Sequence, residues 1–256
     1  MAKQRTRMRI VTGATVLRPL KTSESVARDI VHHLVQNGLT EGDGLPSEGR
    51  MLEQYRVSRE SLREGLRLLE AQGLITLKRG PGGGPFVGTV DPANLARIST
   101  LYYHLAGATY GELFEAWAVA EGHLAERAVH HPDRNLVRAT LEPHLADDGN
   151  GHESLDEFVS HHTEFHTAIA ALAGNRVMQL SLMAIGQTVT HHIAYAADPR
   201  DAVEILLHDH RAIGAAILAG KPLKARDEMH LHLERLAAFY DALSGGTIAD
   251  QLIEWR

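Results

Sequence analysis

The sequence predicts a mainly α-helical protein in which a small N-terminal domain of three helices and a β-hairpin precedes an all-helical C-terminal bundle. Three observations predict this fold class. Apolar residues recur at helical spacing along most of the chain. Only residues 74–88 show two short strand-like runs around a glycine-rich turn. The charge also changes sign, since residues 1–90 carry 14 Lys/Arg and 9 Asp/Glu, whereas residues 91–256 carry 12 and 23.

Composition excludes several classes of protein. Hydrophobic residues make up 44% and charged residues 23% of the 256 positions, which is ordinary for a globular protein and excludes a disordered chain. The chain has no cysteine, so it can form neither disulfides nor thiolate metal sites. No apolar run approaches the about 20 residues that span a bilayer. We therefore expect a cytoplasmic protein without a membrane partner.

The N-terminal third begins with residues 1–18, which we expect to form a flexible basic arm. A helix follows and stops at Gly38, and Ser47 and Ser58 are placed to cap the next two. Gly73 ends the third helix before the two strands and their loop at 80–85. The expected elements are helices at 22–37, 47–55 and 58–72 and strands at 74–77 and 86–88. This order is that of a winged helix-turn-helix, which we assign to residues 19–90.

The third helix carries the strongest signal for DNA binding. Arg59 and Arg63 are four residues apart, so they share one face near the start of the helix. A helix that enters the major groove needs cations there, because they can contact phosphates and guanine O6 and N7. Further backbone contacts are expected from other polar and glycine residues of this domain. The predicted DNA-binding set is Arg50, Ser58, Arg59, Arg63, Lys78, Arg79, Gly82 and Gly83.

Residues 91–256 are expected to form the all-helical domain. Glycines, prolines and asparagines separate the periodic segments, as at Gly107, Pro132, Asn150, Asn175 and Pro222. Asp198-Pro199 marks a further break. The expected helices cover 92–106, 109–130, 133–146, 153–173, 176–197, 201–219 and 222–243.

Histidine is the unusual residue of this domain, with 15 of the chain's 17 copies. Four of them fall on the apolar stripes of three helices, namely His162, His166, His210 and His232. A neutral imidazole in a core needs a partner, and four that converge on one divalent cation would satisfy this need together. Each one alone is more simply a hydrogen-bonded core residue, but four on aligned stripes favour a metal or cavity site.

The N-terminal motifs resemble the GntR family of bacterial transcription regulators. The resemblance rests on Leu45-Pro46-Ser47-Glu48, Val57-Ser58-Arg59, Leu62-Arg63-Glu64, Gly73-Leu74-Ile75 and the glycine-rich turn. It covers about residues 20–90. The family usually has Arg after Pro-Ser-Glu, whereas this chain has Gly49 followed by Arg50.

The second domain resembles the ligand-binding FCD domain of the FadR branch, on Phe165-His166, Gly174-Asn175, His210-Arg211-Ala212-Ile213 and His232-Leu233. The resemblance implies a divalent metal held by three histidines, here His166, His210 and His232, and by an Asp whose position is His162. An all-nitrogen site favours zinc, or nickel, over harder ions. The resemblance also implies an Arg that binds the effector's carboxylate four residues before Glu121, and this chain has Trp117 at that position.

The resemblance implies an effector-responsive DNA-binding regulator, a repressor that is not an enzyme and binds operator DNA as a homodimer. The effector cavity is expected to contain Trp117, Glu121, His191 and His192, and Trp117 either favours a bulkier, more apolar small molecule or simply fills the space. Two alternatives remain. His208-Asp209 is similar to the metal-binding pair of HD phosphohydrolases, which indicates a metal-dependent hydrolase, and the buried histidines would also suit a pure metal sensor.

Overall fold

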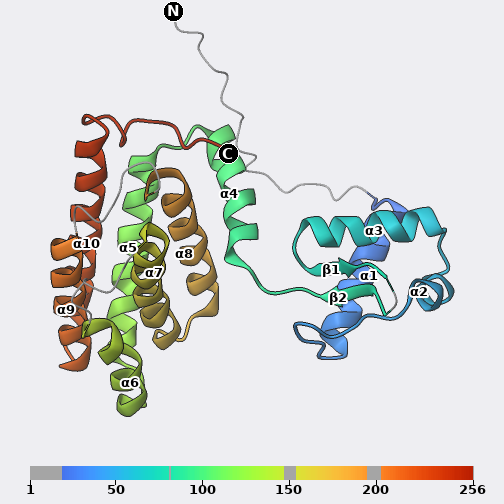
Figure 1. Cartoon of the computed structure of the whole chain (residues 1–256), viewed down its shortest axis with the longest axis horizontal. Helices are drawn as coiled ribbons and strands as arrows, with labels where there is room; N and C mark the ends of the chain where they lie inside the picture. Colours follow the sequence, from blue (N-terminus) through green and yellow to red (C-terminus); the bar gives the residue numbers. More distant parts are fainter. Residues whose placement is uncertain (1–18, 81, 147–153, 195–202, 256) are drawn as a thin grey trace, which may run out of the picture. The chain divides into compact units, whose positions relative to one another are not determined.

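A computed structural model describes residues 19–80, 82–146, 154–194 and 203–255. The chain divides into two units, with the change from one to the other between Asn94 and Leu95. The first unit holds three helices and a two-stranded sheet, and the second is entirely helical in its described residues (Figure 1). The mainly α-helical fold class expected from the sequence is confirmed. None of the described helices is long and apolar enough to cross a bilayer.

The first unit contains α1 (Thr22–Gln36), α2 (Glu48–Tyr55) and α3 (Arg59–Ala71). Ser47 caps α2 by accepting from the backbone N–H of Arg50, and Ser58 caps α3, so each helix begins at the serine that the sequence marks. Their inward faces share one apolar core, in which Ile30, Met51 and Leu62 are fully buried. This core fixes α3 against α1 and leaves its opposite, charged face exposed.

A close helix contact and a hairpin complete this unit. A Cβ atom at Gly65 of α3 would lie 2.9 Å from the backbone oxygen of Ser23 on α1, so the two helices meet where α3 has no side chain. Strands β1 (Ile75–Lys78) and β2 (Gly84–Val87) pair antiparallel, with Ile75 opposite Val87. β2 begins two residues earlier than the sequence predicts, because Lys78 pairs with Gly84 and the turn is correspondingly tighter.

The second unit is built around α5, which packs against α7, α8, α9 and α10 (Figure 1). Its fully buried side chains include Leu124, Phe165, Ile213 and Met229, each from a different helix. The C-terminal segment returns to the start of α5, where Tyr110 N–H donates to the carbonyl of Gln251. The helices are α4 (Pro92–Ala106), which begins before the boundary, α5 (Tyr110–Val129), α6 (Arg134–Leu145), α7 (Leu155–Leu172), α8 (Arg176–Val189), α9 (Val203–Leu218) and α10 (Pro222–Leu243).

The single helix predicted for 176–197 is wrong in its last turns. α8 stops at Val189, and Thr190–Ala194 form a π-helical turn. A π turn holds one more residue than an α turn, so the side chains that follow rotate away from the face that α-helical spacing predicts. The predicted basic arm at residues 1–18 and the breaks at 149–151 and 198–199 lie outside the described residues.

Candidate functional sites

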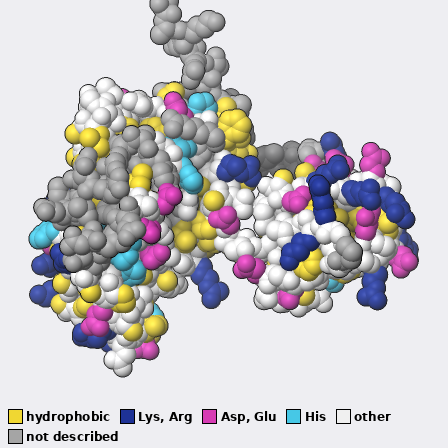
Figure 2. Space-filling view, viewed as in Figure 1, with side chains coloured by type: hydrophobic (Ala, Val, Ile, Leu, Met, Phe, Trp, Pro, Cys, Tyr) yellow, Lys and Arg dark blue, Asp and Glu magenta, His cyan; other side chains and the backbone are white. Residues whose placement is uncertain are grey.

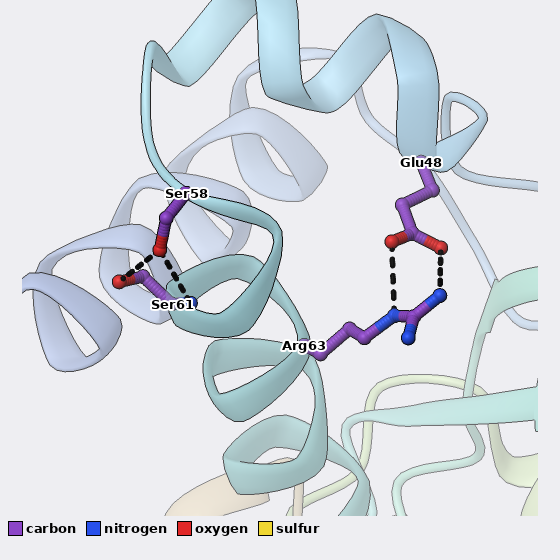
Figure 3. A network of polar contacts seen from close by, with 4 residues as sticks. All are labelled: Glu48, Ser58, Ser61 and Arg63. Carbon is purple, nitrogen blue, oxygen red and sulfur yellow. Dashed lines mark hydrogen bonds and ion pairs between the residues drawn. The ribbon is translucent and has the colours of Figure 1, made fainter.

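The exposed face of α3 begins at its serine cap. Ser58 Oγ accepts from the backbone N–H of Ser61 at 3.1 Å and donates to Ser61 Oγ at 3.0 Å (Figure 3). The predicted DNA-binding role of Ser58 therefore competes with this cap, which already uses its hydroxyl. Arg59 and Arg63 follow on the exposed side, one turn apart. The cap fixes where the helix starts and hence where both guanidinium groups emerge.

Arg63 is held by an ion pair that the sequence does not predict. Its Nε donates to Glu48 Oε1 at 3.0 Å, and its Nη2 donates to Glu48 Oε2 at 3.4 Å (Figure 3). Glu48 is the first residue of α2, 15 positions earlier in the chain. Both side chains remain accessible, at 60% and 35% exposure, so the pair fixes a direction more than it adds stability. The Pro46-Ser47-Glu48 motif is the only sequence signal that could have indicated Glu48.

The other predicted DNA-binding residues lie on the hairpin or on α2. Arg50 and Arg79 are exposed, and Lys78 Nζ lies 4.3 Å from the centre of the Phe86 ring. Gly82 has φ +75°, and a Cβ at Gly83 would lie 2.4 Å from the Lys78 carbonyl oxygen, so the turn itself requires both glycines. Figure 2 shows Lys and Arg side chains along the surface of this unit.

The four histidines of the apolar stripes come together in the second unit. His162 and His166 lie on α7, His210 on α9 and His232 on α10, and one ring nitrogen from each lies within 4.8 Å of those of the others. Ring centres are 4.7 Å apart for His162 and His166 and 5.0 Å apart for His210 and His232. We call these four residues the histidine cluster. His232 is fully buried, and His166 and His210 are nearly so.

The donor chemistry of the histidine cluster fits a divalent metal. The Nε2 atoms of all four rings, and Nδ1 of His162 and of His166, are buried without a hydrogen-bond partner among the described residues. Burial, followed by the charge of neighbouring histidines, holds the pKa of His162 and of His210 well below the usual value. These imidazoles are therefore neutral, which is the form that binds a metal. A buried cation would meet the unsatisfied nitrogens together.

Two buried carboxylates lie beside the rings. Asp209 Oδ2 lies 3.4 Å from His232 Nδ1 and forms a hydrogen bond with it, which turns His232 Nε2 toward the cluster. Glu121 Oε2 lies 3.4 Å from His166 Nδ1, but the two atoms form no hydrogen bond. Arg235 Nη1 donates to Asp209 Oδ1. Burial acts to raise the pKa of Asp209, but His232 and Arg235 outweigh it and the pKa is lowered. The sequence analysis did not predict that Asp209 contacts a histidine of the cluster, although its position next to His210 is a signal for such a contact.

A small cavity adjoins the histidine cluster. It is lined by Trp117, Glu121, His162 and His166 together with residues of α7 and α8, and its volume is about 40 Å³. Trp117 is only 5% exposed, and its Nε1 donates to Glu121 Oε1 at 3.2 Å. Its ring centre is 5.9 Å from that of His166. The indole thus fills part of the cavity, which is the second of the two possibilities that the sequence left open for Trp117.

The sequence predicts that His191 and His192 line this cavity, but the structure places them elsewhere. Neither lines it, because both lie in the π-helical turn. His191 is exposed, and His192 Nδ1 lies 2.9 Å from the hydroxyl of Tyr110. The same turn leaves Thr190 as the last residue of the segment at the cavity.

The His208-Asp209 pair does not form a joint metal site. His208 is exposed, whereas Asp209 is 3% exposed and faces His232 and Arg235. The two side chains therefore point in different directions, as consecutive residues of a helix must. This arrangement gives no support to the metal-dependent hydrolase considered from the sequence.

Two family models match the chain. That of bacterial regulatory proteins of the gntR family matches residues 22–84, and that of the FCD domain matches residues 112–235. The transcriptional repressor NanR of Cronobacter sakazakii is 26% identical over 245 residues, covering 89% of both chains. The Glc operon transcriptional activator of Escherichia coli K12 is 30% identical, covering 63% of this chain and 65% of its own.

Solved structures agree on the fold. A structure described as Streptococcus agalactiae GntR has a TM-score of 0.66 and 22% sequence identity, and the match covers 84% of this chain and 99% of that one. At this identity the likeness shows the fold alone.

Proposed function

Because the chain belongs to the GntR family of bacterial regulatory proteins and carries an FCD domain, we propose that it represses transcription in the cytoplasm by binding operator DNA through α3. The observation that carries this proposal is the serine-capped α3, whose exposed side begins with Arg59 and Arg63. Relatives of this family are transcription regulators, which favours a binding protein over an enzyme. The relative matched over 89% of both chains is named a repressor, which favours repression.

The basic side chains of the first unit would contact different parts of the DNA. Arg59 and Arg63 would contact base edges or phosphates in the major groove, since both emerge near the start of α3. Arg50, Lys78 and Arg79 would contact the sugar-phosphate backbone and so fix the register. We propose a homodimer, which would place two copies of α3 on half-sites about 34 Å apart along a palindromic operator.

The second unit would supply the regulatory input. The histidine cluster would hold one divalent ion, zinc first and nickel second, because nitrogen donors suit these ions. When bound, the ion would act as a Lewis acid that joins α7, α9 and α10. Asp209 would keep His232 turned toward the cluster, and Glu121 would lie beside His166 as a nearby negative charge. Binding there can alter operator affinity only if two conformations of the protein differ in their affinity for the ligand.

Selection of binding sequences from random duplexes tests the DNA-binding proposal. The full chain should enrich a palindrome, and its affinity for that sequence is then measured by fluorescence anisotropy. Arg59→Ala should weaken specific binding about 10-fold or more, since one good base contact contributes about 1–3 kcal/mol. Arg138→Ala removes an exposed arginine of the second unit and should leave affinity unchanged. Equal affinity for Arg59→Ala and the unaltered protein would refute the role of α3.

A further inference from the structure

The space beside the histidine cluster is too small for a sugar-sized effector. The cavity measures about 40 Å³, and a water molecule needs about 10–15 Å³ by this measure. Room for a few waters is not room for a sugar. Trp117 is the reason, because its buried indole is held by Glu121 Oε1 and fills one side of the cavity. The described cavity therefore suits a ligand of about the size of an ion.

The donor set is complete for a tetrahedral ion. Four imidazoles can occupy all four positions, and no protein carboxylate is needed as a direct ligand. Such a set binds zinc, nickel or copper far better than manganese or magnesium, which prefer oxygen. The site is therefore selective in its chemistry, which a sensor requires.

Loading the site requires movement. The four ring nitrogens lie up to 4.8 Å apart, whereas bonds of about 2.0–2.1 Å to zinc place tetrahedral nitrogens about 3.4 Å apart. An ion would therefore draw the four rings, which α7, α9 and α10 carry, closer together, so the loaded and unloaded sites would differ. Building on the regulator function proposed above, we propose that a late transition-metal ion is itself the signal that switches DNA binding.

The test uses the full chain and its selected palindrome, with metal alone as the probe. The dissociation constant for DNA is measured after chelator treatment and again with buffered zinc, nickel or manganese. Zinc or nickel should change the constant at least 10-fold with no organic ligand present, and manganese should change it less than 2-fold. Equal DNA affinity of loaded and stripped protein, with one ion bound per chain, would overturn the proposal and leave the ion structural.

Variants separate the site from the rest of the bundle. His210→Ala should abolish the metal response, whereas His208→Ala, two residues away and exposed, should keep it. His162→Asp keeps four ligands but adds an oxygen donor, so it should gain a manganese response. An unaltered metal preference in His162→Asp would overturn the proposal even if His210→Ala failed to fold. Failure to select any DNA sequence would instead refute the regulator function and the inference with it.

A different observation, the ion pair of Figure 3, carries a second inference. Glu48 occupies Nε and one N–H of Nη2 on Arg63, which leaves both N–H groups of Nη1 and one of Nη2 available. That remaining edge is a planar pair of donors suited to guanine O6 and N7. We infer that Glu48 is a positioning residue that restricts Arg63 to one direction and thereby sets base specificity.

Salt dependence distinguishes positioning from simple stability. Glu48→Gln should free Arg63 for phosphates, so non-specific affinity should rise and the slope of log K against log salt should steepen by about 0.9. The ratio of specific to non-specific affinity should fall at least 5-fold. Glu53→Gln removes the same charge from an exposed position on α2 and should preserve that ratio. An unchanged ratio and slope in Glu48→Gln would overturn the inference.

Discussion

Asp209 offers a direct test of how the histidine cluster is held. It is 3% exposed and accepts contacts from His232 Nδ1 and from Arg235, although neither residue is its neighbour in sequence. Asp209→Asn preserves the size of the side chain but removes its charge. The amide nitrogen must then face either the imidazole or the guanidinium group. We therefore expect His232 to lose the partner that fixes its orientation.

The expected loss of metal affinity follows from that geometry. The substitution acts on the contacts of residue 209 with His232 and Arg235 and touches none of the other three histidines. Removing such an orienting carboxylate typically lowers metal affinity by 10–100-fold, or about 1.4–2.7 kcal/mol. The buried, charge-assisted contacts add about 1.5–3 kcal/mol to the stability of the fold, so the metal-free variant should also unfold more readily.

Competition against a chromophoric chelator measures the zinc affinity of the two proteins at pH 7.5. Asp227→Asn is the matched control, because Asp227 lies on α10 with its side chain 65% exposed and paired with Arg226. The control should bind zinc as the unaltered protein does. Equal zinc affinity for Asp209→Asn would show that the carboxylate does not orient His232 and would refute the reasoning.

Two further predictions concern packing and pH. Gly65→Ala should lower the free energy of unfolding of the first unit by about 1–3 kcal/mol, because its Cβ would lie 2.9 Å from the Ser23 oxygen. Gly49→Ala has open space around it and should raise that free energy by up to about 1 kcal/mol. Urea unfolding measures both changes. Burial lowers the folded-state pKa of His162 and His210, so the unfolded chain takes up protons that the fold excludes. The contribution of these histidines to the stability of the metal-free protein should therefore be constant above about pH 6.5. As the pH falls below that value, stability should decrease by up to about 1.4 kcal/mol per pH unit for each histidine. Equal urea midpoints at about pH 5.5 and pH 7.5 would contradict this prediction.

Local signals were sufficient for most of the first unit. Ser47 and Ser58 cap the helices that the sequence assigned to them, and Gly73 ends α3 with φ +73°. These features depend only on residues a few positions apart, so a sequence shows them directly. The contact between Glu48 and Arg63 spans two helices, and its geometry depends on how the shared core sets their angle. Periodicity indicates which face of each helix is charged but not which residue that face meets.

The histidine cluster was predictable for a related reason. Apolar stripes identify the inward face of a helix, and four histidines on inward faces of one bundle must lie near its axis. The stripe did not indicate Asp209, which is buried by its contacts with His232 and Arg235. The prediction from helical spacing was also wrong for His191, because one π-helical turn rotates the side chains that follow it. Errors of this kind arise wherever an irregular turn interrupts a helix.

The two departures from the family pattern in the second domain compensate each other in charge. The resemblance places an Asp at position 162 and an Arg at position 117, and this chain has a neutral side chain at both. A bound dication would therefore meet the same net charge as in that pattern, with Glu121 and Asp209 still beside the rings. Trp117→Arg alone would bury a cation within reach of the ion, which costs free energy unless an anion enters with it. If the histidine cluster holds a dication as proposed, the two neutral side chains leave its surroundings with the charge that the resemblance implies.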